Sequence, residues 1–256
     1  MADVNQTLAG YRLRSLLQTG QVSQVFEVVE LKTRRTDYGK TTGEWLRRLK
    51  LNEKKIREQW GLAPNVPVVL YTGTFEAYQG LDLLFASMKH VLAARPDARL
   101  LLAGGHPGQV DAARAQAAVA GIAHATIFAG QRPAEEIPAY LDAADVLVSP
   151  RSLGTNTPLK IYQYLRSGRA IVATRLLTHT QVLTDEVSFL TDATPAAYGA
   201  GILAAIADPE KARAVGARAR HLAETKYSYE AYLSHTREAC AHLFRDRAPQ
   251  MAGGVA

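Results

Sequence analysis

The sequence predicts an α/β fold: a doubly wound parallel sheet with helices on both faces, a helical C-terminus and an extra N-terminal hairpin. From position 66 onward, short runs rich in Val, Ile and Leu alternate with segments of helical period, in units of about 25 to 35 residues. Glycine and small polar residues follow most of these runs, where the chain must turn towards a helix. This alternation is typical of a parallel sheet wrapped by helices.

Each element follows from its local pattern. The β-branched runs predict strands at Val66–Tyr71, Ala98–Ala103, Ala125–Phe128, Asp145–Val148 and Ala170–Thr174. Helical period predicts the intervening helices Leu81–Ala94, Val110–Ala120, Ala134–Ala143 and Pro158–Arg166. After the apolar run Ser188–Leu190 the chain becomes helical, over Pro195–Ala207, Pro209–Lys226 and Tyr229–Arg245.

Composition places the chain among globular proteins. It has 256 residues, and its 47% apolar content is enough for a buried core. No apolar run approaches the roughly 18 to 20 residues of a membrane span, and no secretion signal opens the chain, so we expect a cytoplasmic protein. The single cysteine, Cys240, excludes an internal disulfide and a cysteine-built metal site, and its helical surroundings predict a packed thiol.

The net charge of +6 has a local origin, because Lys and Arg crowd a predicted helix within Arg34–Arg57. A solvated helix face is the simplest interpretation, and contact with an anionic membrane surface or an acidic partner is the alternative. Aromatic residues do not alternate with the basic ones there, as they do in proteins that bind single-stranded nucleic acid. We therefore expect no nucleic-acid partner.

The ligand site is expected at the carboxyl ends of the strands, where open α/β sheets bind their ligands. The loops to inspect are residues 73–80, 104–109, 130–132, 149–160 and 174–180. Several are rich in Gly, Thr, Asn and Gln, which allow close backbone approach and offer neutral hydrogen bonds to sugars and phosphates.

The most informative loop is the one that ends at the predicted helix start near Pro158. Pro158 suits the first helical position, and Thr157 or Asn156 could cap the helix. Backbone N–H groups and the positive end of the helix dipole would then face the crevice and favour a diphosphate, to which Lys160 could add a charge. The alternative is an ordinary capped helix with a lysine that faces solvent.

Three segments are similar in order and spacing to the C-terminal domain of family 4 glycosyltransferases. They are Phe128–Gln131, Ile137–Pro150 and Pro158–Thr174. The resemblance covers roughly residues 62–245. It implies the C-terminal half of a GT-B fold and transfer of a sugar from a nucleotide diphosphate sugar, with retention of anomeric configuration. It also implies that neither a metal ion nor another cofactor is needed.

The resemblance is imperfect at four functional positions. The family usually has a Glu in the loop and another eight residues later, where this sequence has Thr155 and Gln163. It commonly offers an Arg and a Lys to the diphosphate from the first loop, where Thr74 and Gln79 stand here. A distinct subfamily with its own donor geometry is the favoured explanation, and a weakened site is the alternative.

Together, loop position and resemblance define the predicted site. Thr155 and Lys160 take the catalytic positions, and no residue is assigned to a metal. Gln131 and Arg132 would approach the nucleobase, and Arg151 the donor or acceptor. The histidines of these loops, His106 and His179, are interpreted as surface residues. The predicted donor-binding residues are Gly73, Thr74, Gln79, Gly80, Gly104, Gly105, Gln131, Arg132, Arg151, Gly154, Asn156, Thr157, Pro158 and Gln163.

The N-terminal segment is different in kind. Tyr11–Val29 predicts two strands around a small-residue turn and resembles the Gly-rich hairpin of protein kinases, with Gly20 as the one glycine kept. No Val-Ala-Ile-Lys, His-Arg-Asp or Asp-Phe-Gly motif follows, so kinase activity is set aside. The expected organisation is a kinase-hairpin-like or disordered segment (1–43), a linker helix (44–61), a nucleotide-sugar-binding domain (62–245) and a disordered tail (246–256).

The sequence suggests three functions. The first is a glycosyltransferase donor domain whose acceptor site comes from a second chain or domain. The second is a nucleotide-sugar-binding module without turnover, which the missing carboxylates would suit. An oxidoreductase is disfavoured, because no Gly-x-Gly-x-x-Gly follows the first strand and no acidic residue ends the second.

Overall fold

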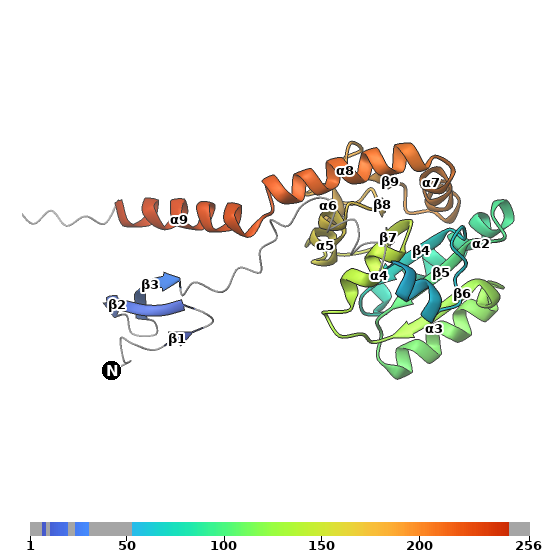
Figure 1. Cartoon of the computed structure of the whole chain (residues 1–256), viewed down its shortest axis with the longest axis horizontal. Coiled ribbons are helices and arrows are strands. Elements are labelled where there is room, and N and C mark those ends of the chain that lie inside the picture. The colour runs from blue at the N-terminus through green and yellow to red at the C-terminus, as the bar shows by residue number, and fades with distance from the viewer. Residues whose placement is uncertain (1–6, 9–10, 20–23, 31–52, 246–256) are drawn as a thin grey trace, which may run out of the picture. The chain divides into compact units, whose positions relative to one another are not determined.

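The computed structural model describes residues 7–8, 11–19, 24–30 and 53–245 (Figure 1). The chain divides into two compact units, Met1–Arg47 and Arg48–Ala256. In the first unit, strands β1 (Thr7–Leu8), β2 (Tyr11–Thr19) and β3 (Gln24–Glu30) pair antiparallel in that order. The two predicted strands therefore form, but the turn between them, with Gly20, lies outside the described residues, and the kinase resemblance stays untested.

The second unit is built on a six-stranded, all-parallel sheet, as predicted. The strand order is β6-β5-β4-β7-β8-β9. Strands β5 and β6 are added on one side of β4, and strands β7, β8 and β9 are then added on its other side. This reversal is the topological switch point of a doubly wound sheet. The strands are β4 (Val68–Thr72), β5 (Arg99–Ala103), β6 (Thr126–Gly130), β7 (Val146–Ser149), β8 (Ala170–Thr174) and β9 (Phe189–Thr191).

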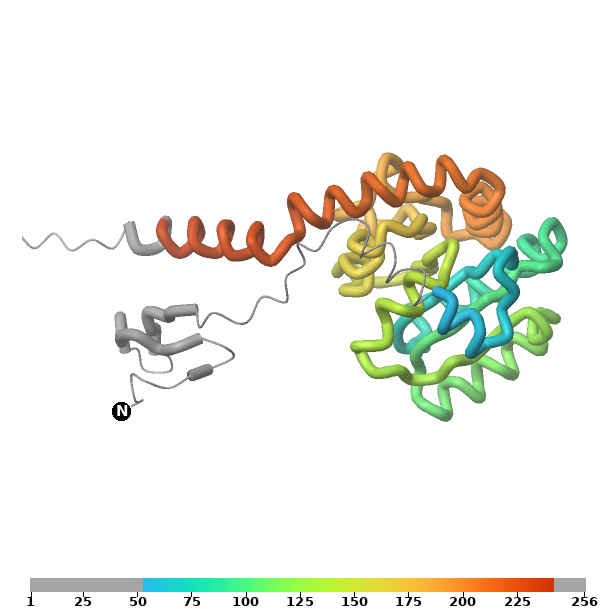
Figure 2. Tube along the Cα trace, in the orientation of Figure 1, coloured from blue at the N-terminus to red at the C-terminus, as the bar shows by residue number. Residues whose placement is uncertain are grey.

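The long helices begin and end close to their predicted bounds. Figure 2 shows the course of the Cα trace through them. The short elements η1, η2 and α6 carry too few residues for a helical period, and the sequence did not predict them. Residues 53–59 are helical, and the start of the predicted linker helix lies outside the described residues. The helices are η1 (Ala77–Gln79), α2 (Leu81–Ala94), α3 (Pro107–Val119), η2 (Ala123–Ala125), α4 (Ile137–Ala143), α5 (Lys160–Ser167), α6 (Leu177–Thr180), α7 (Pro195–Ala207), α8 (Pro209–Thr225) and α9 (Tyr229–Arg245).

Two apolar cores lie on opposite faces of the sheet, because successive strand residues point to opposite sides. Along β4, Val69 and Tyr71 join the core with α2, α3 and α7, whereas Val68 and Leu70 join the core with α4, α5 and α8. All four of these side chains are fully buried. Strands buried on both faces read as continuous apolar runs, which is why the sequence showed them so clearly.

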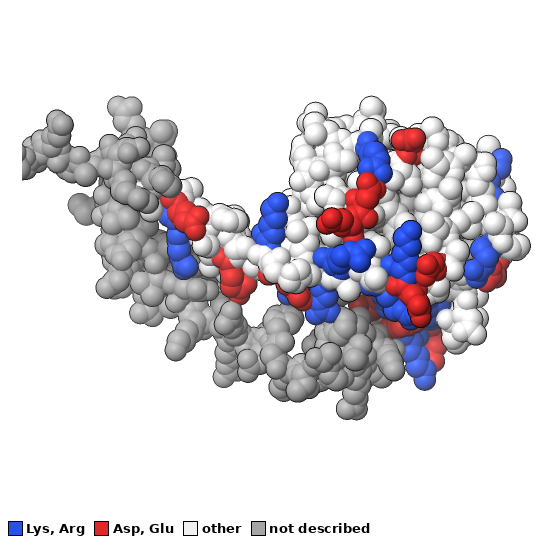
Figure 3. Space-filling view, turned by 90° about the horizontal axis from the view of Figure 1, so that it is seen from above, with Lys and Arg blue, Asp and Glu red and all other residues white. Residues whose placement is uncertain are grey.

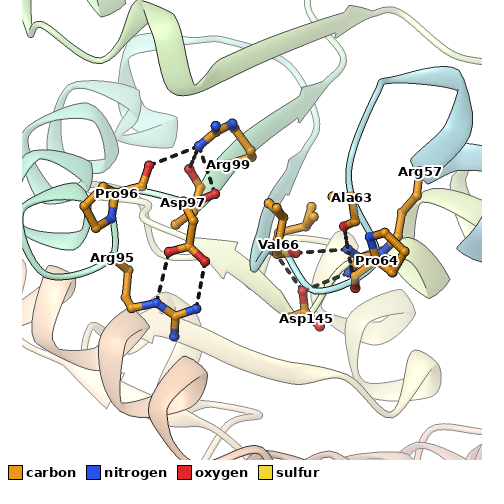
Figure 4. A network of polar contacts seen from close by, with 11 residues as sticks. Arg57, Ala63, Pro64, Val66, Arg95, Pro96, Asp97, Arg99 and Asp145 are labelled. Carbon is orange, nitrogen blue, oxygen red and sulfur yellow. Dashed lines mark hydrogen bonds and ion pairs between the residues drawn. The ribbon is translucent and has the colours of Figure 1, made fainter.

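Arg57 joins the segment before β4 to the sheet (Figure 4). Its guanidinium donates to the carbonyls of Ala63, Pro64 and Val66 at 2.9–3.3 Å and to the Asp145 carboxylate at 3.0 Å. Only 7% of the Arg57 side chain is exposed. Arg57 therefore does not belong to a solvent-facing basic patch, as the sequence suggested. Lys54 and Lys55 of the same segment are exposed, and residues 34–52 lie outside the described residues.

Replacing Arg57 by leucine should lower the free energy of unfolding by about 1.5–3 kcal/mol, because buried hydrogen bonds to a charged group are lost. Arg99→Leu is the matched control, since its guanidinium also donates to three carbonyls, those of Pro96, Asp97 and Ala98, but at the surface. It should cost less than about 1 kcal/mol. Urea denaturation measures both changes, and equal costs would show that the Arg57 network is not special.

The described surface carries charges of both signs. On the face seen in Figure 3, basic and acidic side chains lie side by side. Ion pairs form between exposed residues of the described chain, for example Arg175–Asp185 at 2.7 Å. Cys240 is exposed on α9, so the prediction of a packed thiol was wrong; apolar neighbours along the helix do not ensure that anything covers it. None of the helices among the described residues is long and apolar enough to cross a membrane.

Candidate functional site

The predicted loops meet at the switch point between β4 and β7. Residues 73–80 follow the carboxyl end of β4, and residues 149–160 follow that of β7. The two loops contact each other through the backbone, since Ser152 N donates to Tyr78 O at 3.2 Å. Two loops that are far apart in the sequence thus form one edge, at the place where open α/β sheets hold their ligands.

Glycines make this close approach possible. A Cβ on Gly80 would lie 2.8 Å from the Pro150 carbonyl carbon and closer still to its oxygen. A Cβ on Gly104 would collide in the same way with the Gly73 carbonyl, and one on Gly105 would lie 2.7 Å from the Phe75 ring. Gly80 and Gly104 also have φ values of +75° and +134°, which favour glycine. The predicted glycines therefore bring the loops together.

Lys160 stands at the centre of this edge. Its Nζ donates to the Thr72 carbonyl and to Oε1 of Gln79, each at 3.2 Å, and lies 3.9 Å from the centroid of the Tyr71 ring. A Cβ built on Gly73 would be 3.6 Å from the same nitrogen. The structure thus brings together three predicted residues from two loops, Gly73, Gln79 and Lys160.

The ammonium of Lys160 is costly to keep charged in this position. Burial lowers its pKa to about 7, and the nearby Arg151 guanidinium acts in the same direction. Its hydrogen-bond acceptors, the Thr72 carbonyl and the Gln79 side-chain amide oxygen, carry no net charge. An anion that approaches Gly73 would supply the charge that these partners do not.

Arg151 organises the loop after β7 from inside. Only 7% of the residue is exposed, and its guanidinium donates to Leu153 O at 2.8 Å and to the backbone and side-chain oxygens of Asn156 at 3.1 and 3.2 Å. It also lies 5.0 Å from the centroid of the Tyr78 ring. A Cβ on Gly154 would collide with this guanidinium. Arg151, Gly154 and Asn156 therefore form one local structure.

The helix start differs from the prediction. Helix α5 begins at Lys160, after a turn in which Ile161 N donates to Pro158 O at 3.0 Å, and no side chain caps it. Thr157 Oγ1 instead donates to Gln181, and Asn156 Oδ1 accepts from Arg151. The predicted cap was wrong, because other segments compete successfully for both side chains.

His179 is fully buried, so its interpretation as a surface residue was wrong. Its Nε2 lies 2.8 Å from Ser149 Oγ, and its Nδ1 lies 2.9 Å from the Thr174 carbonyl oxygen. A carbonyl can only accept, so Nδ1 carries the proton and Nε2 accepts from the serine. Burial lowers the pKa of His179 to about 4, which keeps the ring neutral near pH 7. His106, in contrast, is exposed as predicted and caps α3 through Nδ1.

The remaining predicted residues are more dispersed. Three of them are exposed: Thr74 on the loop after β4, Thr155 on the loop after β7, and Gln163 on α5. Gln131 and Arg132 follow β6, which is an edge strand of the sheet. The guanidinium of Arg132 donates two hydrogen bonds to the Ala129 carbonyl oxygen.

Two hollows of the described surface lie elsewhere and contain none of the predicted donor-binding residues. The first is lined by Asp185, Ser188, Phe189, Leu190, Thr191, Gly201, Lys211 and Val215, and the second by Tyr162, Lys226, Tyr227, Ser228, Tyr232 and His235.

The sequence missed the residues that support the site from behind. Tyr71 OH donates to Thr74 O at 2.6 Å, and Tyr164 OH, from α5, accepts from Thr72 N at 3.0 Å. Both tyrosines are fully buried. Each sits within an apolar run, where an aromatic residue simply indicates core, so no local signal reveals that its hydroxyl holds a loop.

Comparison with known proteins identifies relatives of the unit that contains this sheet. Residues 52–222 match the model of the family described as glycosyl transferases group 1. A D-inositol 3-phosphate glycosyltransferase of Segniliparus rotundus is 32% identical over 181 residues, which are 68% of this chain and 40% of that protein. A GDP-mannose-dependent alpha-(1-6)-phosphatidylinositol monomannoside mannosyltransferase of Mycolicibacterium smegmatis is 29% identical over 177 residues, 66% of this chain and 46% of its own.

Solved structures share the fold. Sucrose-phosphate synthase from Thermosynechococcus elongatus superposes with a TM-score of 0.65 and 26% identity, over 75% of this chain and 49% of that one. HepE of Anabaena, in complex with UDP, gives a TM-score of 0.68 at 20% identity, over 75% of this chain and 53% of that one. The chain therefore spans about half the length, or less, of the proteins it matches.

Proposed function

The chain belongs to the glycosyl transferases group 1 family, and we propose on that basis that its larger unit binds the diphosphate of a nucleotide-sugar donor and takes part in transferring the sugar. The diphosphate would lie at the edge between the β4 and β7 loops, beside Gly73 and Lys160. The donor sugar would extend towards Thr155, and the acceptor would be held by a second chain or domain.

One observation carries this proposal: the buried ammonium of Lys160 lies at this edge and feels the Arg151 guanidinium, and both cations donate hydrogen bonds to oxygens without net charge. Cations in a partly buried site favour an anionic ligand, because the anion offsets the cost of their desolvation. Gly73 leaves room for a phosphate oxygen next to Nζ of Lys160. HepE, with the same fold, was solved with UDP bound, which is consistent with a nucleotide at such an edge.

We propose further that the reaction retains the anomeric configuration, as the resemblance to family 4 glycosyltransferases implies. We also propose that it needs no metal ion, because the ammonium of Lys160 would supply the positive charge that a departing diphosphate requires. Lys160 is thereby the residue nearest to the reacting phosphate. Gln163, three residues along the same helix, would donate to a ribose hydroxyl as a neutral amide.

A binding module without turnover is the second candidate. Thr155 and Gln163 stand where carboxylates are usual in family 4 glycosyltransferases, and neither can carry negative charge. A sugar donor would then be held without the charge that stabilises its oxocarbenium-like transition state.

Titration separates these functions. UDP, GDP and ADP, and then UDP-glucose and GDP-mannose, are titrated into the full chain by calorimetry, and release of nucleoside diphosphate is followed with and without polyol and sugar acceptors. Binding with release supports a transferase and refutes the module, and binding without release refutes transfer by this chain alone. Failure of every nucleotide to bind at millimolar concentration would refute both.

Binding of UDP-glucose should weaken as the pH rises above about 7. The pKa of Lys160 is about 7 in the empty site and must rise when a diphosphate lies beside it, so binding above pH 7 takes up a proton. The dissociation constant should increase by up to about tenfold per pH unit there and stay level below it. UDP-glucose is the right probe, since its substituted diphosphate does not itself titrate near pH 7.

Lys160→Arg provides the control for this pH dependence, because arginine stays charged throughout the range. Its dissociation constant for UDP-glucose should not depend on pH between 6 and 9. A pH dependence that persists in the variant would assign the proton to another group.

A further inference from the structure

Helix α6 contacts the loop after β7 on the outside of the molecule. Gln181, the exposed residue that ends α6, donates through Nε2 to the Thr155 carbonyl at 3.1 Å. Its Oε1 accepts from Thr157 Oγ1 at 3.0 Å. One amide thus holds two points of the loop, on either side of Asn156.

The same short helix contacts the loop on the inside. His179 binds Ser149 at the end of β7 and Thr174 at the end of β8. The Thr174 hydroxyl in turn donates to the Arg151 carbonyl at 2.6 Å. A continuous set of hydrogen bonds therefore joins α6 to the residue from which the loop leaves the sheet.

Between these two points lies the part of the loop with little other support. Four consecutive residues there are exposed, namely Leu153, Gly154, Thr155 and Asn156. Gly154 has a φ of +114°. Such a segment is free to adopt many conformations unless side chains fix it. Arg151 fixes the inner half, and the amide of Gln181 fixes the outer half.

We propose that His179 and Gln181 are positioning residues that clamp the donor loop, residues 149–160. His179 holds the loop from the protein interior, and Gln181 holds it from the exposed surface. The proposal rests on the proposed function, because the clamp matters only if the loop binds a donor. The clamp then holds the loop in its binding conformation before the donor arrives. Binding then avoids the entropy of ordering the loop, which otherwise reduces affinity. His179 stays neutral through the physiological range, so the inner half of the clamp does not depend on pH near 7.

The clamp is tested by Gln181→Ala, which removes both outer bonds from an exposed position and should leave the melting temperature within about 2 °C. Amide hydrogen exchange of residues 153–157 in the ligand-free protein should become faster by about three- to tenfold, with the sheet unchanged. The dissociation constant for UDP-glucose should rise by a similar factor. A purely structural role would change the melting temperature and leave loop exchange and affinity alone.

Two further variants sharpen the test. Gln116→Ala removes an exposed amide from α3 and should change neither exchange nor affinity. Thr157→Val removes one bond of the clamp, and combining it with Gln181→Ala should add less than the sum of the separate effects, because the two share that bond.

The outcomes distinguish the clamp from the proposed function. If the wild-type chain binds UDP-glucose but Gln181→Ala binds it equally well, or exchanges at the wild-type rate, the clamp is refuted and the donor site stands. If the wild-type chain binds neither UDP-glucose nor GDP-mannose, the proposed function fails and the clamp loses its purpose with it.

Discussion

Replacing Lys160 by alanine is expected to weaken binding of the nucleotide diphosphate by about 1.5–3 kcal/mol, roughly ten- to 150-fold in the dissociation constant. The reason is the position of Nζ, which lies beside Gly73 and donates to the uncharged oxygens of Thr72 and Gln79. A diphosphate at this edge would form the charged hydrogen bond that these partners cannot. Calorimetric titration of the nucleotide that binds the wild-type chain measures the loss.

The control for this variant is Lys89→Ala, which removes an exposed lysine from α2 and leaves the net charge equal to that of Lys160→Ala. Comparing the two separates a direct contact from a general loss of positive charge. The folded state should tolerate Lys160→Ala well, because the substitution removes a charge that burial disfavours. An affinity equal to that of Lys89→Ala would remove Lys160 from the donor site.

Gly80→Ala is expected to lower the free energy of unfolding by about 2–5 kcal/mol. One part is the strain of a left-handed residue, about 1–2 kcal/mol. The other part is the collision of Cβ with the Pro150 carbonyl, which would force the β4 and β7 loops apart. Chemical denaturation gives the total, and nucleotide affinity should fall as well, because the same two loops form the site.

Gly121→Ala measures the strain alone, so its difference from Gly80→Ala gives the cost of the collision. Gly121 has a φ of +73°, almost the same as Gly80, but a Cβ there would meet nothing within 4 Å. It should cost only the strain, about 1–2 kcal/mol. If the two variants were equally destabilised, the close approach of the two loops would not constrain the fold.

Much of the fold was predictable because its signals are local. Strand β8 and helices α2, α7 and α9 begin and end where the sequence placed them, since strand and helix periods are set by neighbouring residues. Helix α6 was missed because four residues cannot show a period. The N-cap of α5 was predicted wrongly because the preference of Thr157 for capping lost to its contact with Gln181, 24 positions away.

The site was predictable as a set of loops but not as a set of contacts. The rule that ligands bind at the carboxyl ends of strands selected Gly73, Gln79 and Lys160 from the right segments. It could not show that Nζ of Lys160 reaches Gln79, 81 positions earlier. It also gave no reason to suspect that His179 is buried, because a single histidine in a polar loop carries the same local pattern whether it is exposed or enclosed.

The amino-acid sequence by itself determined the alternation of strands and helices, the two-faced core and the glycines that let loops approach one another. These follow from short-range period and from the conformations that each residue type allows. Only the tertiary structure decided which charges lose their water, where Lys160 and Arg57 point, and that Cys240 stays exposed. Burial and charge depend on residues that are distant in the chain and adjacent in space, and no local pattern contains that information.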